Sequence, residues 1–206
     1  MLDNLAKLSD SELLRRSLTG DESAFIVLYE RLKGPIFKYA FYMTSSSSAA
    51  EEVTQEVFLA LLESGKRYKV TEGDVAAFVF GIARNMVKRM RRQERPYQQL
   101  PSQDWAGKRV GGETPTEGLT GQLIRNEKLA SMRAAIASLP DHYRQVVVIC
   151  DLCDFSYEQA AARLGCAIGT IRSRLNRAHR LLALKLRDSR ISPAELRAGG
   201  TEECLI

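Results

Sequence analysis

The sequence predicts an all-α protein made of two helical modules joined by a flexible linker. Three observations support this prediction. Apolar residues recur at helical spacing along most of the 206-residue chain. Residues typical of helix starts and stops bracket these periodic segments. One long stretch, residues 96–122, is rich in proline and glycine and has no apolar period, so it separates a front module from a back module.

The front module, residues 9–95, contains a series of amphipathic segments with recognisable ends. Ser9, Asp21, Ser48 and Asp74 each precede an apolar-periodic run and can accept a hydrogen bond from the first helical turn. Ser9 with Glu12, and Ser48 with Glu51, also match the capping-box pattern. Gly34 and Pro35 together predict that one helix ends and a new one begins, since proline suits a first turn. The expected helices cover residues 10–19, 22–33, 35–43, 49–64 and 75–94.

The back module, residues 123–187, is also predicted to be helical, with a tail at 188–206. The run "VVVIC" favours a strand by propensity alone. We expect a helix there, because no partner strand is evident anywhere in the sequence. Ser156 and Gln159 form another capping box, and Gly165 closes the short helix that follows it. A second, basic helix begins three residues later, which is the pattern of a helix-turn-helix.

A helical wheel divides the second helix of this pair into two faces. Ile171, Leu175, Ala178 and Leu182 form one apolar stripe. Polar and basic side chains occupy the opposite face, where arginines can neutralise phosphates and the N-terminal residues can reach base edges in a major groove. These candidates are Arg172, Ser173, Asn176, Arg177 and Arg180, together with Thr170 and Tyr157 near the helix starts. A merely solvated basic face remains an alternative, whereas a membrane-surface helix would want bulky aromatic residues that this stripe lacks.

Charge and composition narrow the possible functions. The net charge is +5. Residues 159–187 contain seven basic residues and no acidic residue, which favours a polyanionic partner. No apolar run is long enough for a membrane span and no signal peptide is evident, so we expect a cytoplasmic protein without membrane insertion. Cys150 and Cys153 form a single C-x-x-C pair without the further ligands that zinc needs, so no metal and no cofactor are expected. No phosphate-binding glycine loop or nucleophile constellation is present, so an enzyme is not expected.

Several longer strings resemble a known family. "SLPDHYRQVVVICDLCDFSYEQAAARLGCAIGTIRSRLNRAHRLL" is similar to region 4 of bacterial extracytoplasmic-function (ECF) sigma factors. "DESAFIVLYERLKGPIFKYA", "AAEEVTQEVFLALLE" and "AAFVFGIARNMVKRMRRQ" resemble region 2 of the same family, in the same order and spacing. Ala167 departs from the proline that is usual in the family's turn.

The resemblance implies a sigma factor that binds the clamp and flap of core RNA polymerase and reads double- and single-stranded promoter DNA. Region 4 would bind the −35 element through the helix-turn-helix, and region 2 would bind and help to melt the −10 element. The region 2 residues implied for DNA are Lys66, Arg67, Tyr68, Arg84, Asn85, Lys88, Arg89 and Arg92. Glu52, Gln55 and Glu56 would form the polymerase-binding face. Family members are usually restrained by an anti-sigma factor, which is therefore expected here.

One alternative function remains open at this point. The chain could be a dimeric helix-turn-helix regulator whose front module serves for dimerisation or sensing. The acidic helix next to the basic "IARNMVKRMRRQ" helix favours the sigma factor, because a simple repressor would not need that pairing.

Overall fold

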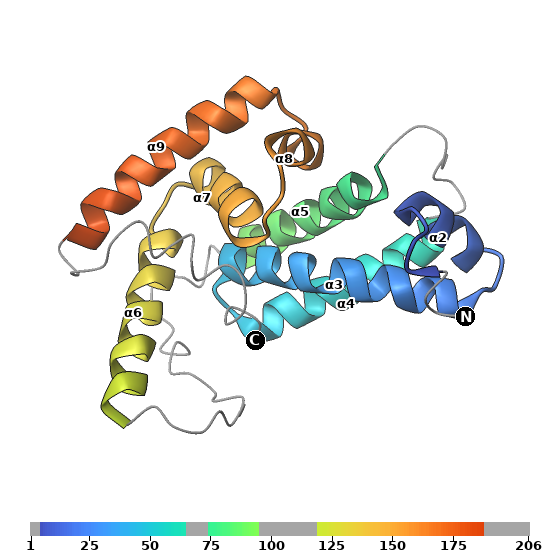
Figure 1. Ribbon diagram of the computed structural model, residues 1–206, viewed down its shortest axis with the longest axis horizontal. Coiled ribbons are helices and arrows are strands. Elements are labelled where there is room, and N and C mark those ends of the chain that lie inside the picture. The colour runs from blue at the N-terminus through green and yellow to red at the C-terminus, as the bar shows by residue number, and fades with distance from the viewer. Residues whose placement is uncertain (1–4, 65–73, 95–118, 188–206) are drawn as a thin grey trace.

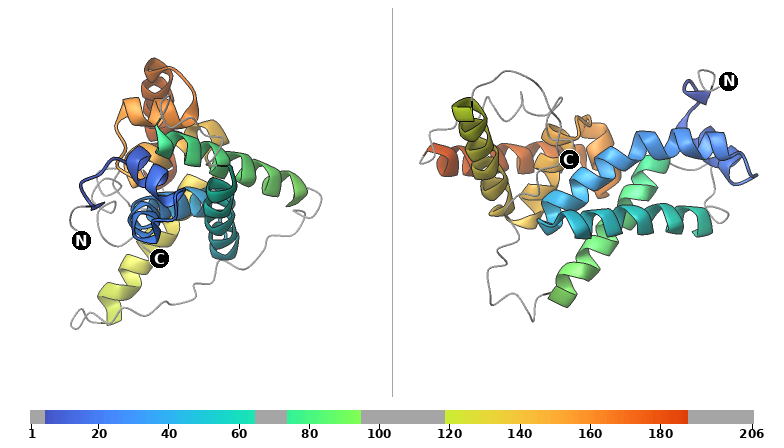
Figure 2. Two further views of the ribbon diagram at one scale, coloured as in Figure 1. Left: turned by 90° about the vertical axis from the view of Figure 1, so that its right-hand side faces the viewer. Right: turned by 90° about the horizontal axis from the view of Figure 1, so that it is seen from below.

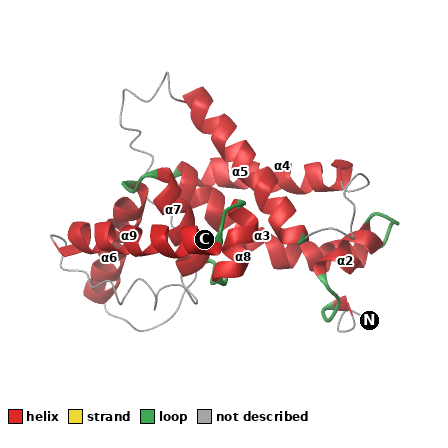
Figure 3. Ribbon diagram, turned by 90° about the horizontal axis from the view of Figure 1, so that it is seen from above, coloured by secondary structure: helices red, strands yellow, loops and turns green. Residues whose placement is uncertain are grey.

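The computed structural model describes residues 5–64, 74–94 and 119–187, and within these ranges every regular element is helical (Figures 1 and 3). The prediction of an all-α fold is thus confirmed. In chain order the elements are α2 (Asp10–Ser17), α3 (Glu22–Thr44), α4 (Ser47–Ser64), α5 (Val75–Glu94), α6 (Leu119–Ala137), α7 (Asp141–Val147), η2 (Val148–Leu152), α8 (Tyr157–Leu164) and α9 (Ile168–Arg187). The residues of the expected linker before 119, and the expected tail, lie outside the described ranges.

The front module is built around α3, which packs against α2, α4 and α5 (Figure 1). Leu28, Ile36 and Tyr39 of α3 are almost fully buried, together with Val57 of α4 and Phe80 of α5. Burial of these large apolar side chains is the main force that holds the four helices together.

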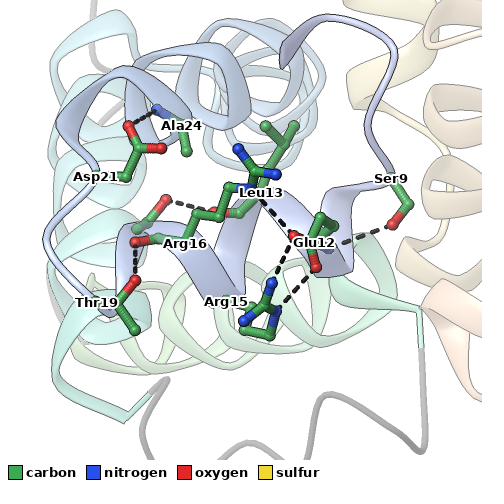
Figure 4. A network of polar contacts seen from close by, with 9 residues as sticks. Ser9, Glu12, Leu13, Arg15, Arg16, Thr19, Asp21 and Ala24 are labelled. Carbon is green, nitrogen blue, oxygen red and sulfur yellow. Dashed lines mark hydrogen bonds and ion pairs between the residues drawn. The ribbon is translucent and has the colours of Figure 1, made fainter. Parts of the chain in front are cut away.

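Short polar side chains define the starts of the front helices. Ser9 Oγ accepts the Glu12 N–H at 3.3 Å, and Asp21 Oδ1 accepts the Ala24 N–H at 3.0 Å (Figure 4). The Glu12 carboxylate does not return to the Ser9 backbone but pairs with Arg15 and Arg16, and these bonds lower the pKa of Glu12 to about 2. The serine half of the predicted capping box is therefore present without its glutamate half.

The start of α4 corrects one prediction. The cap is Ser46 rather than Ser48, because Ser46 Oγ accepts the Ala49 N–H at 3.2 Å and the Ser46 carbonyl accepts the Ala50 N–H. Four consecutive serines offer several equivalent caps, and local sequence alone does not choose among them. Asp74 is confirmed as the cap of α5, since its Oδ1 accepts the Ala76 N–H at 3.0 Å.

The break expected at Pro35 is wrong. Residues 22–44 form one continuous helix with Pro35 inside it. Its buried residues Leu28, Leu32, Ile36 and Met43 keep helical register on both sides of the proline, so tertiary packing outweighs the hydrogen bond that the proline removes.

The back module consists of α6 to α9. Its first helix begins at Leu119, a few residues before the start at 123 that the sequence predicts. The "VVVIC" segment is helical, as predicted, but the second half of the segment widens into a π-helix, η2. The Cys153 N–H closes this turn on the Val148 carbonyl at 3.0 Å. Val146 to Ile149 are fully buried, so their strand propensity reflects their suitability for an apolar interior.

The two modules share one hydrophobic core. α8 lies against α5, while η2, α7 and α6 contact α3 (Figures 1 and 2). Phe80 of α5 meets Phe155, which precedes α8, edge to face with ring centroids 5.6 Å apart. The modules are thus docked on one another, an arrangement that the sequence did not predict.

Candidate nucleic-acid and polymerase interfaces

The helix-turn-helix is formed by α8 and α9, and local hydrogen bonds fix its geometry. Ser156 Oγ accepts the Gln159 N–H at 3.2 Å while Gln159 Oε1 accepts the Ser156 N–H at 3.0 Å, which confirms the predicted capping box. Gly165 ends α8 in the left-handed conformation with φ +64°, a conformation that glycine adopts at little cost. After Gly165, the Thr170 N–H donates to the Ala167 carbonyl and α9 begins.

The predicted division of α9 into two faces is confirmed. Ile171, Leu175, Ala178 and Leu182 are buried, with at most 4% of each residue exposed. The opposite face is open to solvent and carries Arg172, Ser173, Asn176, Arg177 and Arg180. The stripe holds α9 on the module, so this basic face is presented outward as a rigid surface.

The residues at the start of this surface lie close to one another. The Arg172 guanidinium lies 6.0 Å from the centre of the exposed Tyr157 ring, so α8 and α9 each contribute a side chain to one patch. Ser173 Oγ donates to the Thr170 carbonyl at 3.1 Å, as serine often does inside a helix. The charge of Arg172 also contributes to lowering the pKa of Glu158, after hydrogen bonds from its own backbone N–H and from Ser156.

One anchor of α9 was missed by sequence reasoning. His179 Nε2 lies 2.6 Å from Asp151 Oδ2, and this links the recognition helix to η2 on the side away from the open face. Asp151 is 11% exposed at its side chain, so the contact is largely shielded from water. A histidine one residue from a basic face gives no sequence signal for such a role.

Some basic residues of α5 are exposed to solvent, whereas Arg84 is bound to the back module. Asn85, Lys88, Arg89 and Arg92 are exposed along one side of the helix. Arg84 is half-buried instead, and its Nη1 donates to the Leu164 carbonyl at the end of α8, 2.5 Å away. The other candidates for the −10 element, Lys66, Arg67 and Tyr68, lie outside the described residues.

The third candidate surface lies on α4. Glu52, Gln55 and Glu56 are all exposed, as predicted. The structure adds Leu59 and Leu62, which are 54% and 38% exposed next to them. An apolar centre beside acidic side chains is typical of protein docking surfaces. Sequence reasoning missed the two leucines because a leucine at helical spacing is usually assigned to the core.

Arg163 does not face solvent, although it belongs to the basic block that suggested a polyanion partner. Only 5% of its side chain is exposed, and its guanidinium lies 3.9 Å from the centre of the Phe155 ring. Burial lowers the pKa of Arg163, which the neighbouring Asp74 partly offsets. The basic block of the sequence therefore supplies both the exposed face of α9 and one buried contact, that of Arg163.

In the ranges described, no group of three or more histidine, cysteine, aspartate or glutamate side chains could hold a metal ion. Cys150 and Cys153 are free thiols, and burial raises the pKa of each to about 12. None of the helices in these same ranges has the length and apolar character that crossing a bilayer requires.

Comparison with known proteins supports the two-module organisation. Residues 28–97 match the family model "Sigma-70 region 2", and residues 129–182 match "Sigma-70, region 4". The ECF RNA polymerase sigma factor SigE of Mycolicibacterium smegmatis is 31% identical over 169 residues, which are 80% of this chain and 63% of SigE. The ECF RNA polymerase sigma factor EcfG of Rhodopseudomonas palustris is 30% identical over 72% of this chain and 77% of EcfG. The chain thus spans less than two thirds of SigE, but most of EcfG.

Solved structures show the same fold. CnrH, in complex with the cytosolic domain of CnrY, superposes with a TM-score of 0.63 at 19% identity, over 87% of this chain and 97% of CnrH. The sigma factor RpoE of Bartonella quintana, in complex with the anti-sigma factor NepR, gives a TM-score of 0.53 at 27% identity, over 76% of this chain and 92% of RpoE.

Proposed function

The chain belongs to the ECF RNA polymerase sigma factor family, whose members are non-enzymatic subunits that direct transcription initiation, and from this premise we propose a role for each surface. The open face of α9 reads the −35 element, α5 with the preceding loop holds the −10 strand, and α4 docks on core polymerase. The domain limits predicted from the sequence are 9–95 for region 2, 96–122 for the linker, 123–187 for region 4 and 188–206 for the tail, and we propose that region 4 begins at Leu119, where α6 starts. The expectation that the chain is not an enzyme is confirmed by its family membership.

The observation that carries the −35 assignment is the outward basic face of α9. Arg172, Ser173 and Asn176 lie on its N-terminal half, which is the part of a recognition helix that reaches base edges in the major groove. Arg177 and Arg180 lie further along and suit phosphate contacts, which supply affinity without sequence information.

The −10 assignment is supported by the exposed cations of α5. Lys88, Arg89 and Arg92 form a basic track with Asn85 among them, and such a track can hold the backbone of a melted strand while polar side chains contact its bases. Arg84 joins this track only when its bond to the Leu164 carbonyl is broken.

The polymerase assignment can be tested by one charge reversal. Glu56→Lys places a cation in the acidic part of the α4 surface, and we expect it to reduce co-purification with core RNA polymerase at least tenfold, about 1.4 kcal/mol. Glu56 is exposed to solvent, so the substitution should leave the fold unaffected. The measurement is the amount of chain retained by immobilised core polymerase at several chain concentrations.

The matched control is Glu30→Lys, which reverses an exposed charge on α3 that pairs with its neighbour Lys33. It should leave retention unchanged. Failure of the well-folded wild-type chain to bind core polymerase would contradict the proposal and favour the alternative, a dimeric helix-turn-helix regulator.

We also propose a cytoplasmic location and an anti-sigma partner. The location follows from the task of binding polymerase and DNA. The partner is supported by RpoE of Bartonella quintana, which is 27% identical and was solved together with its anti-sigma factor.

A further inference from the structure

Besides the shared hydrophobic core, the two modules contact each other through cations bound to the ends of helices. Arg84 of α5 donates to the carbonyl of Leu164, the last residue of α8, at 2.5 Å. Lys38 of α3 donates to the carbonyl of Leu152, the last residue of η2, at 3.0 Å. The last carbonyls of a helix have no partner within it and carry partial negative charge. Each of these cations from the front module therefore caps a helix of the back module.

The back module returns the same kind of contact. Arg144 of α7 is buried, and one of its nitrogens lies 3.5 Å from the carbonyl of Met43, next to the last residue of α3. Arg144 Nη2 bonds within the back module, where it donates to the Leu139 carbonyl at 3.0 Å. Arg91 of α5 and Asp141 of α7 add an ion pair across the boundary at 2.6 Å. Each module thus donates hydrogen bonds to the other, and the contacts at the edges of the boundary are polar.

Arg163 forms the central contact. Its guanidinium lies between the Phe155 ring of the back module, 3.9 Å from the ring centre, and the Phe80 ring of the front module, at 5.6 Å. It also lies 3.4 Å from Asp74, the residue that caps α5. A shielded cation between two aromatic faces and a carboxylate is a strong anchor.

The same boundary is incompletely satisfied. Buried arginine Nε atoms without a hydrogen-bond partner among the described residues occur at four positions, and each of these arginines touches the other module. They are Arg84, Arg133, Arg144 and Arg163. Orphaned buried donors oppose burial, and permanent cores contain few of them. The polar part of this boundary is therefore less fully hydrogen-bonded than a typical protein interior.

We propose that the free chain is held in a closed state in which α8 covers part of α5, and that Arg163 is the latch of this state. The inference rests on the proposed function, since Arg84, the residue of the −10 track that α8 engages, is one of those proposed to bind the melted strand. In the closed state Arg84 binds the Leu164 carbonyl and is not available to DNA. Release of the Arg163 contact frees α5 for the melted strand and allows the two modules to separate.

Arg163→Gln tests the latch in the full-length chain. A closed chain of 206 residues should have a radius of gyration near that of a compact protein, about 17 Å. In small-angle scattering we expect this radius to rise by several ångströms in the variant. The affinity for a fluorescein-labelled single DNA strand of about 12 nucleotides should also rise, by roughly two- to tenfold.

The direction of the change in DNA affinity is the sharper test. Removal of a cation weakens DNA binding when only charge matters, so a gain in affinity requires that the variant expose a binding surface. Arg187→Gln is the matched control, because it removes an exposed cation at the end of α9, away from the boundary. It should leave the radius unchanged and should not increase the affinity.

A folded Arg163→Gln chain with the wild-type radius and no gain in DNA affinity would overturn the proposal. If circular dichroism shows that this variant is unfolded, Arg84→Gln replaces it in the scattering experiment, since it removes the bond to α8 without altering the back module. A wild-type chain that is already extended would overturn the closed state, and with it the latch. Loss of the sigma-factor role would appear separately, as failure of the wild-type chain to bind core polymerase.

Discussion

At the residue scale, Arg172 is the side chain best placed to discriminate between promoter sequences. It is exposed on the N-terminal half of α9 and lies 6.0 Å from the Tyr157 ring, which limits its range of orientations. We expect Arg172→Ala to cost about 1–3 kcal/mol on DNA duplexes that the wild-type chain selects from a random pool. On duplexes altered at the contacted base pair the loss should be much smaller. Fluorescence anisotropy at several salt concentrations measures both.

Arg177→Ala is the companion variant, since Arg177 lies further along the same face. It should weaken binding to all duplexes equally and reduce the salt dependence, as loss of a phosphate contact does. The same uniform behaviour in Arg172→Ala would show that Arg172 also contacts phosphate and that specificity resides elsewhere.

Residues differ in how far their sequence context predicts their place. Arg172 and Arg180 could be placed because their own helix decides which face is buried, and the apolar stripe of α9 marks that face. Arg84 and Arg163 could not, because a wheel shows one helix only. Their surroundings come from the other module, and nothing in the spacing of α5 or α8 specifies that contact.

At the element scale, the turn between α8 and α9 depends on a single backbone conformation. Gly165 has φ +64°, and a Cβ built there would meet no atom within 4 Å, so the only cost of a side chain is backbone strain. We expect Gly165→Ala to lower the free energy of unfolding by about 1 kcal/mol. Urea denaturation of the full chain, followed by circular dichroism, gives this difference.

Gly169 provides a control of opposite sign. It lies inside α9 with helical dihedrals, and a Cβ there would also meet no atom within 4 Å. Gly169→Ala should therefore raise the free energy of unfolding by roughly 0.5–1 kcal/mol. Equal destabilisation by both substitutions would contradict the assignment of the Gly165 effect to its positive φ.

Elements were predicted well where one local signal dominated and less well where signals competed. The ends of α8 follow from Ser156, Gln159 and Gly165, which leave little choice to the backbone. Gly34 and Pro35 suggest a break that the buried stripe of α3 prevents. The π-helical turn of η2 has no signature in the "VVVIC" run, because it accommodates packing against α3 rather than any preference of its own residues.

At the scale of the whole molecule, the sequence predicts two modules but not their docking. Each module has its own periodicity and caps, and these are local properties. The docked arrangement depends on cations that find helix ends far away in the chain, such as Lys38 with Leu152 and Arg84 with Leu164. Such pairs leave no periodic trace in a single sequence, so they become visible only in three dimensions.

Docking also gives the molecule a chemical reporter of its state. Cys153 follows η2, and its thiol lies 3.7 Å from the Pro35 carbonyl in the other module. Burial raises the pKa of Cys153 to about 12, so very little of the reactive thiolate exists near pH 8. Because α3 of the front module contributes the Pro35 contact, separation of the modules should return Cys153 to water and lower this pKa toward its ordinary value.

We therefore expect iodoacetamide at pH 8 to modify Cys153 slowly in the wild-type chain and at least tenfold faster in Arg163→Gln. Mass spectrometry of tryptic peptides over time measures the rate at each cysteine. Cys166, half-buried in the turn after α8, serves as the internal reference and should react at similar rates in both chains. Fast modification of Cys153 in the wild-type chain, equal to that of Cys166, would mean that the modules separate freely without loss of the Arg163 latch.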